Sequence, residues 1–223
     1  MSQEIKIEKK ASEVIQPVSE KEAREAIRSR KDLSGAQLRG LKLANLNVSG
    51  AILRKTDLSG ADLSHGLLMN PNFYRASLHG ASINNTIFLG GDLVRASFKA
   101  ADLSDSVLFG VDAEDANFEG ANLRDAALVN ANLRNASFNQ ANLSNARLAS
   151  LDVTGADFSG AELTGAHAYR VDWSKAKNPP AVLPEPFLQL PLWVWSVIIG
   201  GFLGLIALII YALVRKQKKS SAD

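Results

Sequence analysis

The chain offers few residues suited to catalysis or to metal binding. Among its 223 residues there are 3 histidines and no cysteine, which excludes disulfides and thiolate metal sites. The histidines are His65, His79 and His167, and a metal site would require them to converge with other ligands. Serine is frequent, but no glycine-rich phosphate loop opens a helix. Whether the histidines meet depends on the elements that carry them.

Those elements follow a five-residue repeat that runs without a break over residues 31–175. The central residue of each unit is large and apolar, except at Ala113 and Ala168. Alanine is frequent two residues before the centre, and glycine, asparagine or aspartate two residues after it. On a helix this period would spread the central side chains around the cylinder, and in one long strand it would alternate their faces. A short extended step followed by a corner instead places alanine and the central residue inside a tube.

The units "ADLSG", "ANLRD" and "ADFSG" resemble those of the pentapeptide repeat family. The resemblance covers most of the chain and implies an all-β solenoid, a right-handed quadrilateral β-helix with four units in each coil. At about 4.8 Å per coil, about seven coils would form a rod about 35 Å long. Ala113 and Ala168 would fill less of the core than the other central residues, and Trp173, the last central residue, would close the end of the stack.

A coil of four units separates the histidines onto three different faces, so we expect neither a metal site nor a cofactor. We predict a non-enzymatic protein. Some members of the family act on DNA topoisomerases and resemble DNA in shape and acidity, which requires a strong negative field. Acidic and basic residues nearly balance over residues 31–175, and those members lack a membrane anchor. A DNA-mimicking, topoisomerase-directed protein is therefore the alternative interpretation, and nucleic acid is not an expected partner.

One face of the predicted solenoid is apolar on its outside. In units such as "TIFLG" the second and fourth residues point outward and are aliphatic instead of polar. Stacking every fourth unit aligns them, and the predicted partner-binding residues are Leu67, Met69, Ile87, Leu89, Val107, Phe109, Val129 and Tyr169. Two other faces are mainly polar, and the remaining one is mainly charged with Ile52, Tyr74 and Val94 as exceptions. Monomers seldom leave such a patch in water, so we expect a protein partner or a second copy to cover it. The chain's own N-terminal segment and the membrane surface are the alternatives.

The segment before the repeats is predicted to form a mobile end and a cap. Residues 1–18 are charged and lack the apolar core of a secretory signal. The sequence "SEKE" indicates a capping box that starts a short helix over residues 19–30. The apolar side of this helix would consist of Ala23, Ala26 and Ile27. An open end of a solenoid exposes core residues and unpaired backbone groups, and this helix is the candidate to cover them.

The segments after the repeats are predicted to anchor the protein. Residues 176–191 are rich in proline and are expected to form an extended linker. Residues 192–214 are apolar and uncharged, and they exceed the roughly 20 residues that cross a bilayer. We predict a single transmembrane helix with Gly200 and Gly204 as a GxxxG packing motif, followed by a basic tail over residues 215–223.

The orientation in the membrane stays open from the sequence. The basic tail alone would place the C-terminus in the cytoplasm, but the repeats would then need export without a signal. A C-terminal anchor leaves them in the cytoplasm without further machinery, and we favour that arrangement. The family is abundant in cyanobacteria, where the resemblance would imply a plasma or thylakoid membrane. The sequence thus predicts a membrane-anchored scaffold that presents a rigid rod to a protein partner.

Overall fold

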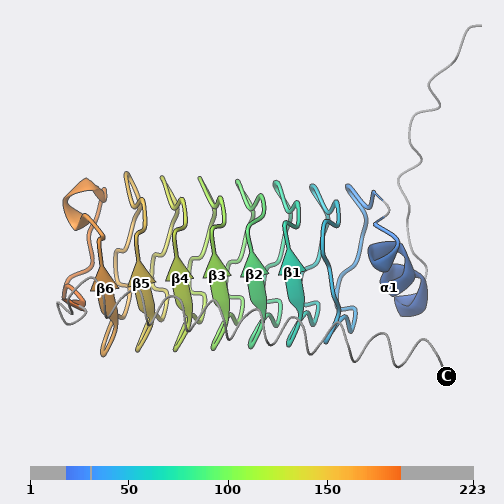
Figure 1. Ribbon diagram of the computed structural model, residues 1–223, viewed down its shortest axis with the longest axis horizontal. Helices are drawn as coiled ribbons and strands as arrows, with labels where there is room; N and C mark the ends of the chain where they lie inside the picture. The colour runs from blue at the N-terminus through green and yellow to red at the C-terminus, as the bar shows by residue number, and fades with distance from the viewer. Residues whose placement is uncertain (1–18, 31, 187–223) are drawn as a thin grey trace, which may run out of the picture. The chain divides into compact units, whose positions relative to one another are not determined.

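A computed structural model describes residues 19–30 and 32–186. The helical elements are α1 (Glu20–Arg28) and the 3-10 helix η1 (Trp173–Lys175). The strands are β1 (Leu67–Met69), β2 (Ile87–Leu89), β3 (Val107–Phe109), β4 (Ala127–Val129), β5 (Arg147–Ala149), β6 (His167–Tyr169) and β7 (Glu185–Pro186). Strands β1 to β6 follow one another along the solenoid, and α1 lies at its N-terminal end (Figure 1).

The repeats form the predicted parallel β-solenoid. Strands β1 to β6 pair in chain order with a constant offset of four units, so that Leu67 lies beside Ile87 and Ile87 beside Val107. Isolated bridges with the same offset join the other faces. The solenoid has about six turns, where the sequence predicts about seven. The first coil contributes no regular strand. It joins the next coil only through isolated bridges, such as Asp32 to Ile52.

A continuous apolar core fills the inside of the solenoid. Central residues such as Leu103 and the preceding alanines such as Ala101 are buried, as the five-residue pattern requires. Four phenylalanine rings from successive coils stack face to face, with centroids 4.9, 4.8 and 4.9 Å apart, and they are Phe98, Phe118, Phe138 and Phe158. Trp173 packs edge-on against Phe158 at 5.2 Å and closes this stack, as predicted.

The corners between units adopt the left-handed backbone conformation. Glycine, asparagine and aspartate occupy most of them, because these residues tolerate positive φ best. Gly91, the residue that follows the corner at Gly90, has the largest positive φ, 114°. A Cβ atom there would lie 2.7 Å from Cδ of Pro71, so only glycine fits without a shift of the neighbouring coil.

Helix α1 begins as the capping box predicts. The Ser19 side chain accepts a hydrogen bond from the Glu22 amide at 3.2 Å. The helix ends at Arg28, earlier than the predicted residue 30, because Ser29 is its C-cap and Arg30 turns to a positive φ of 53°. Its apolar residues Ala23, Ala26 and Ile27 are all buried in the core.

A side chain of α1 also satisfies backbone groups at the open end of the solenoid. Arg24 donates to the carbonyl oxygens of Lys42 and Ala44. Both carbonyls belong to the first coil, which within the described part of the chain has no preceding coil to pair with. The helix therefore covers core side chains and also partners carbonyl groups of the first coil.

The C-terminal end of the solenoid differs from the prediction. Pairing continues beyond residue 175, since the Phe158 amide donates to the Asn178 carbonyl at 2.8 Å. Residues 176–186 do not form an extended spacer: the Glu185 amide donates to the Ala166 carbonyl at 3.2 Å, and β7 follows β6 in the sheet. Proline breaks the repeat, but the amide of Glu185, which lies between two prolines, still donates to the last coil.

The other predicted segments lie outside the described residues. They are the N-terminal residues 1–18, the rest of the linker, the predicted transmembrane residues 192–214 with Gly200 and Gly204, and the basic tail. Within residues 19–30 and 32–186, no helix combines the length and apolar character that crossing a membrane requires.

Candidate interaction surface

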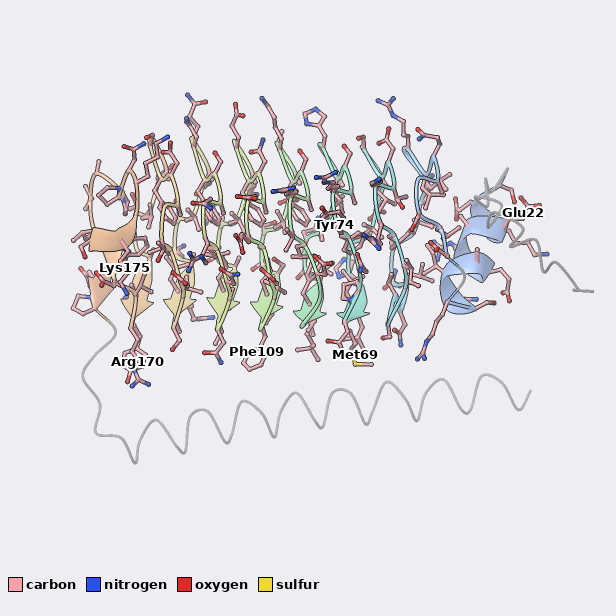
Figure 2. The ribbon with its side chains drawn as sticks, turned by 90° about the horizontal axis from the view of Figure 1, so that it is seen from above. Glu22, Met69, Tyr74, Phe109, Arg170 and Lys175 are labelled. Carbon is pink, nitrogen blue, oxygen red and sulfur yellow. The ribbon has the colours of Figure 1, made fainter. Side chains whose placement is uncertain are left out.

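The outward side chains of β1 to β4 form one apolar surface. Each strand buries its middle residue completely and leaves the two flanking residues half-buried. We call the flanking residues of these four strands the apolar stripe: Leu67, Met69, Ile87, Leu89, Val107, Phe109, Ala127 and Val129. Met69 and Phe109 project from the same side of the solenoid (Figure 2).

Strict register holds the apolar stripe together. Leu89 lies beside Phe109, and Phe109 lies beside Val129. At a strand spacing of about 4.8 Å, side chains on neighbouring rungs are within van der Waals reach of each other. The stripe is therefore two parallel columns that the backbone fixes, and its shape does not depend on a loop.

Polar residues limit the apolar stripe at its N-terminal end and limit one of its two columns at the other end. Asn47 bridges to Leu67 on one side, and on the other side β5 presents the exposed Arg147 beside Ala127. Tyr169, predicted as part of the same surface, lies on β6 in the other column, where the half-buried Ala149 stands between it and Val129. Its ring is half-buried and Arg170 stands over it at 5.7 Å. The structure thus brings seven of the eight predicted partner-binding residues together, and Tyr169 continues one of their columns beyond Ala149.

Aspartates next to the corners are structural carboxylates. Asp102 accepts hydrogen bonds from the Ser104 amide and hydroxyl and from the side-chain amides of Asn84 and Asn122. Burial, the largest single influence, raises the pKa of Asp102, but these hydrogen bonds together lower the pKa below its ordinary value. The hydroxyl two residues further on is the main cause of a lowered pKa at Asp32, Asp152, Asp157 and Asp172. Such carboxylates stay ionised at neutral pH and hold the backbone of the corner.

The histidines occupy separate positions on the solenoid. His65 is a corner residue with φ of 56°, His79 is exposed, and His167 belongs to β6. In the described part of the chain, no group of three or more histidine, aspartate or glutamate side chains could hold a metal ion. The absence of a metal site and of an enzymatic activity stays a prediction from the sequence.

The structure adds one cluster to the sequence prediction. One ring and two cations on the mainly charged face meet: Arg54 and Arg75 both lie 5.1 Å from the centroid of the Tyr74 ring. The sequence shows Tyr74 only as an exception to a polar pattern. The sequence signal that could have found the cluster is the offset of four units that brings Arg54 beside Tyr74.

Three solved structures illustrate what the chain is similar to. HetL, a pentapeptide repeat protein involved in heterocyst differentiation regulation in the cyanobacterium Nostoc, is 24% identical over 69% of this chain and 85% of its own, with a TM-score of 0.31. A trypsin-treated form of QnrB1, a plasmid-mediated fluoroquinolone resistance protein, is 23% identical over 76% of this chain and 94% of its own, with a TM-score of 0.41. A pentapeptide repeat protein of the Arabidopsis thaliana thylakoid lumen is 28% identical over 52% of this chain and 69% of its own, with a TM-score of 0.22.

Comparison with protein families identifies the repeats. No curated protein is significantly similar to the chain. The family profile described as a pentapeptide repeat region matches residues 81–158. The profile described as pentapeptide repeats (8 copies) matches residues 32–68 and 141–176, and together the two profiles cover more than half of the chain. This protein belongs to the pentapeptide repeat family.

Proposed function

We propose that the protein is a membrane-anchored, non-enzymatic scaffold that binds a protein partner through the apolar stripe. The observation that carries this proposal is the register of β1 to β4, which aligns large apolar side chains where the repeat elsewhere places polar ones. A soluble monomer seldom keeps a continuous apolar patch in water. A partner that covers the patch removes it from water and gains the free energy of burial.

The shape of the apolar stripe defines the kind of contact. Its two columns are about 7 Å apart and its rungs about 4.8 Å apart, so the apolar area is narrow and elongated. Phe109 is the largest side chain in its middle, and large aromatic residues at the centre of an interface are typical hot spots. A specific interface buries about 800 Å² on each partner, so the partner also contacts the polar residues beside the stripe.

The predicted anchor completes the proposal. Residues 192–214 carry no charge and would hold the solenoid close to a membrane, with the repeats in the cytoplasm and no cofactor. Deleting residues 188–223 should release the protein from membranes. If the truncated protein still sediments with membranes after a carbonate wash, these residues are not the main anchor. Protease digestion of the repeats from outside intact cells would overturn the cytoplasmic placement.

Two matched double variants test whether the apolar stripe binds a partner. Ile87→Asp with Phe109→Asp introduces two charges on adjacent rungs of the stripe, and Ser97→Asp with Asn117→Asp does so on adjacent rungs of a polar face. All four side chains are half-buried. Because a docked apolar interface excludes unpaired charges, the stripe variant should lose the proteins that co-purify with the wild type from detergent, and the polar-face variant should keep them. Retention of every partner by a folded stripe variant would refute the proposal.

A further inference from the structure

A second surface, separate from the apolar stripe, collects positive charge. Arg54, Lys55, Arg75 and Arg95 are exposed on three successive coils, and the half-buried Tyr74 lies among them. We call this surface the basic patch and define it as Ile52, Arg54, Lys55, Tyr74, Arg75, Val94 and Arg95. Tyr74 lies on a different side of the solenoid from Met69 and Phe109 (Figure 2).

The backbone at the basic patch is unusual for such long side chains. Lys55, Arg75 and Arg95 stand at corners with φ of 55°, 56° and 58°, in the left-handed region that disfavours most residues other than glycine, asparagine and aspartate. The same corner in other coils carries Gly35, Asp115, Asn135 and Gly155. Stability of the corner therefore does not explain why three successive coils carry cations there.

Repulsion among the charges of the basic patch adds to the conformational cost of the left-handed corners. Cations on neighbouring coils, about 4.8 Å apart along the backbone, repel one another. Arg95 is paired with Asp115 at 3.1 Å. Arg54 and Arg75 instead share the ring of Tyr74, each 5.1 Å from its centroid. These cation–π contacts orient two guanidinium groups about one aromatic ring, and guanidinium groups bind carboxylates with a bidentate geometry.

The limits of the basic patch decide what it can bind. Along the same face, Asp32 precedes the patch, Asp92 lies on its third coil, and Asp112 and Glu114 follow. Because Arg95 on the third coil is already paired with Asp115, the favourable field comes from Arg54, Lys55 and Arg75 on two coils, about 5 Å apart. A nucleic acid backbone binds along a longer basic track, and a flat anionic membrane would also meet these acidic residues. A short anionic segment fits between them.

Nearby apolar residues and the spacing of the coils favour a peptide as the short anionic segment that the basic patch binds. Ile52 is a large hydrophobic residue with 37% exposure, and the half-buried Val94 lies two coils along the same face. On an α-helix, side chains three or four residues apart are about 5–6 Å from each other, close to the spacing of the coils. We propose that the basic patch binds a short acidic helical segment of a partner protein, with carboxylates three or four residues apart and an apolar residue beside them.

The test uses a fluorescein-labelled synthetic peptide with three glutamates four residues apart and leucines beside them. Its binding to the full-length protein in detergent is measured by fluorescence anisotropy. Arg54→Glu with Arg75→Glu should weaken binding at least 100-fold, since two charge-assisted contacts become repulsive. Arg39→Glu with Lys99→Glu makes the same change in charge on another face and should leave the affinity within about threefold, because at physiological salt charges beyond about 8 Å are screened.

Further variants and ligands distinguish binding at the basic patch from binding at the apolar stripe and from general effects of charge. Lys55→Gly should weaken peptide binding and raise the midpoint of thermal unfolding, because glycine relieves the left-handed corner. Ile87→Asp with Phe109→Asp should bind the peptide like the wild type, so failure here is distinct from failure of the stripe. The proposal is overturned if the wild type does not bind the peptide or if the two charge-reversal variants bind it equally. Tighter binding of phosphatidylserine vesicles or of a single-stranded oligonucleotide, lost in the Arg54 and Arg75 variant, would also overturn it.

Discussion

The phenylalanine stack permits a prediction whose size follows from the geometry. Phe118 lies between Phe98 and Phe138, with centroid distances of 4.9 and 4.8 Å and interplanar angles of 5° and 6°. Phe88 is equally buried, but its ring meets Phe73 at 6.5 Å and at 54°. Leucine occupies many central positions of the repeat, so it fits the backbone at either site.

The comparison of Phe118→Leu with Phe88→Leu isolates the stacking term. Both changes remove a similar apolar volume, but Phe118→Leu breaks two stacked ring contacts and Phe88→Leu breaks one tilted contact with Phe73. Each such contact contributes about 0.5–1.5 kcal/mol, so the two variants differ by about one contact. We expect Phe118→Leu to lower the free energy of unfolding by about 1 kcal/mol more than Phe88→Leu does. Urea unfolding followed by far-ultraviolet circular dichroism measures both variants. Equal losses would refute the view that the stack stabilises the solenoid beyond the burial of apolar area.

Three further predictions address the corners and the end of the solenoid. The pKa of Asp102 is lowered in the folded state. The ionised Asp102 carboxylate therefore stabilises the fold above the unfolded pKa of about 3.9, and this stabilisation is lost as pH falls through the folded pKa. Asp102→Asn should therefore destabilise the protein by about 1–2 kcal/mol near pH 7 and flatten the loss of stability below about pH 4, measured by urea unfolding at several pH values. Arg24→Ala should raise amide hydrogen exchange in the first coil, because the carbonyl of Lys42 loses its donor; unchanged exchange would argue against the cap. Gly91→Ala should lower the thermal midpoint more than Gly110→Ala, because only the first meets a neighbouring coil, and equal shifts would contradict the close approach.

The sequence predicts the solenoid because one physical requirement recurs in every unit. A large central residue such as Leu103 must enter the core, and the corner must accept positive φ, so the five-residue period is visible without a structure. The same period predicts the plug at Trp173, and the capping box predicts the start of the helix at Ser19. The period also predicts which face holds Ile87 and Phe109, because register follows from the constant offset between coils.

The period does not predict features that depend on single contacts. Residues 176–186 have no repeat, so their pairing with the last coil through Glu185 depends on which amides find a carbonyl. The contacts of Arg54 and Arg75 with Tyr74 depend on side-chain conformations that the sequence pattern leaves undefined.

The central claim is that the apolar stripe is a partner-binding surface, and site-specific photo-cross-linking tests it most directly. A benzophenone amino acid replaces Phe109 in one variant of the full-length protein and Asn117 in another, so that the probe lies on the stripe or on a polar face. After irradiation in cells, we expect the probe at position 109 to capture one defined protein or a second copy of the chain, and the probe at position 117 to capture neither. Equal capture at both positions, or cross-links from position 109 only within the same chain, would contradict the claim.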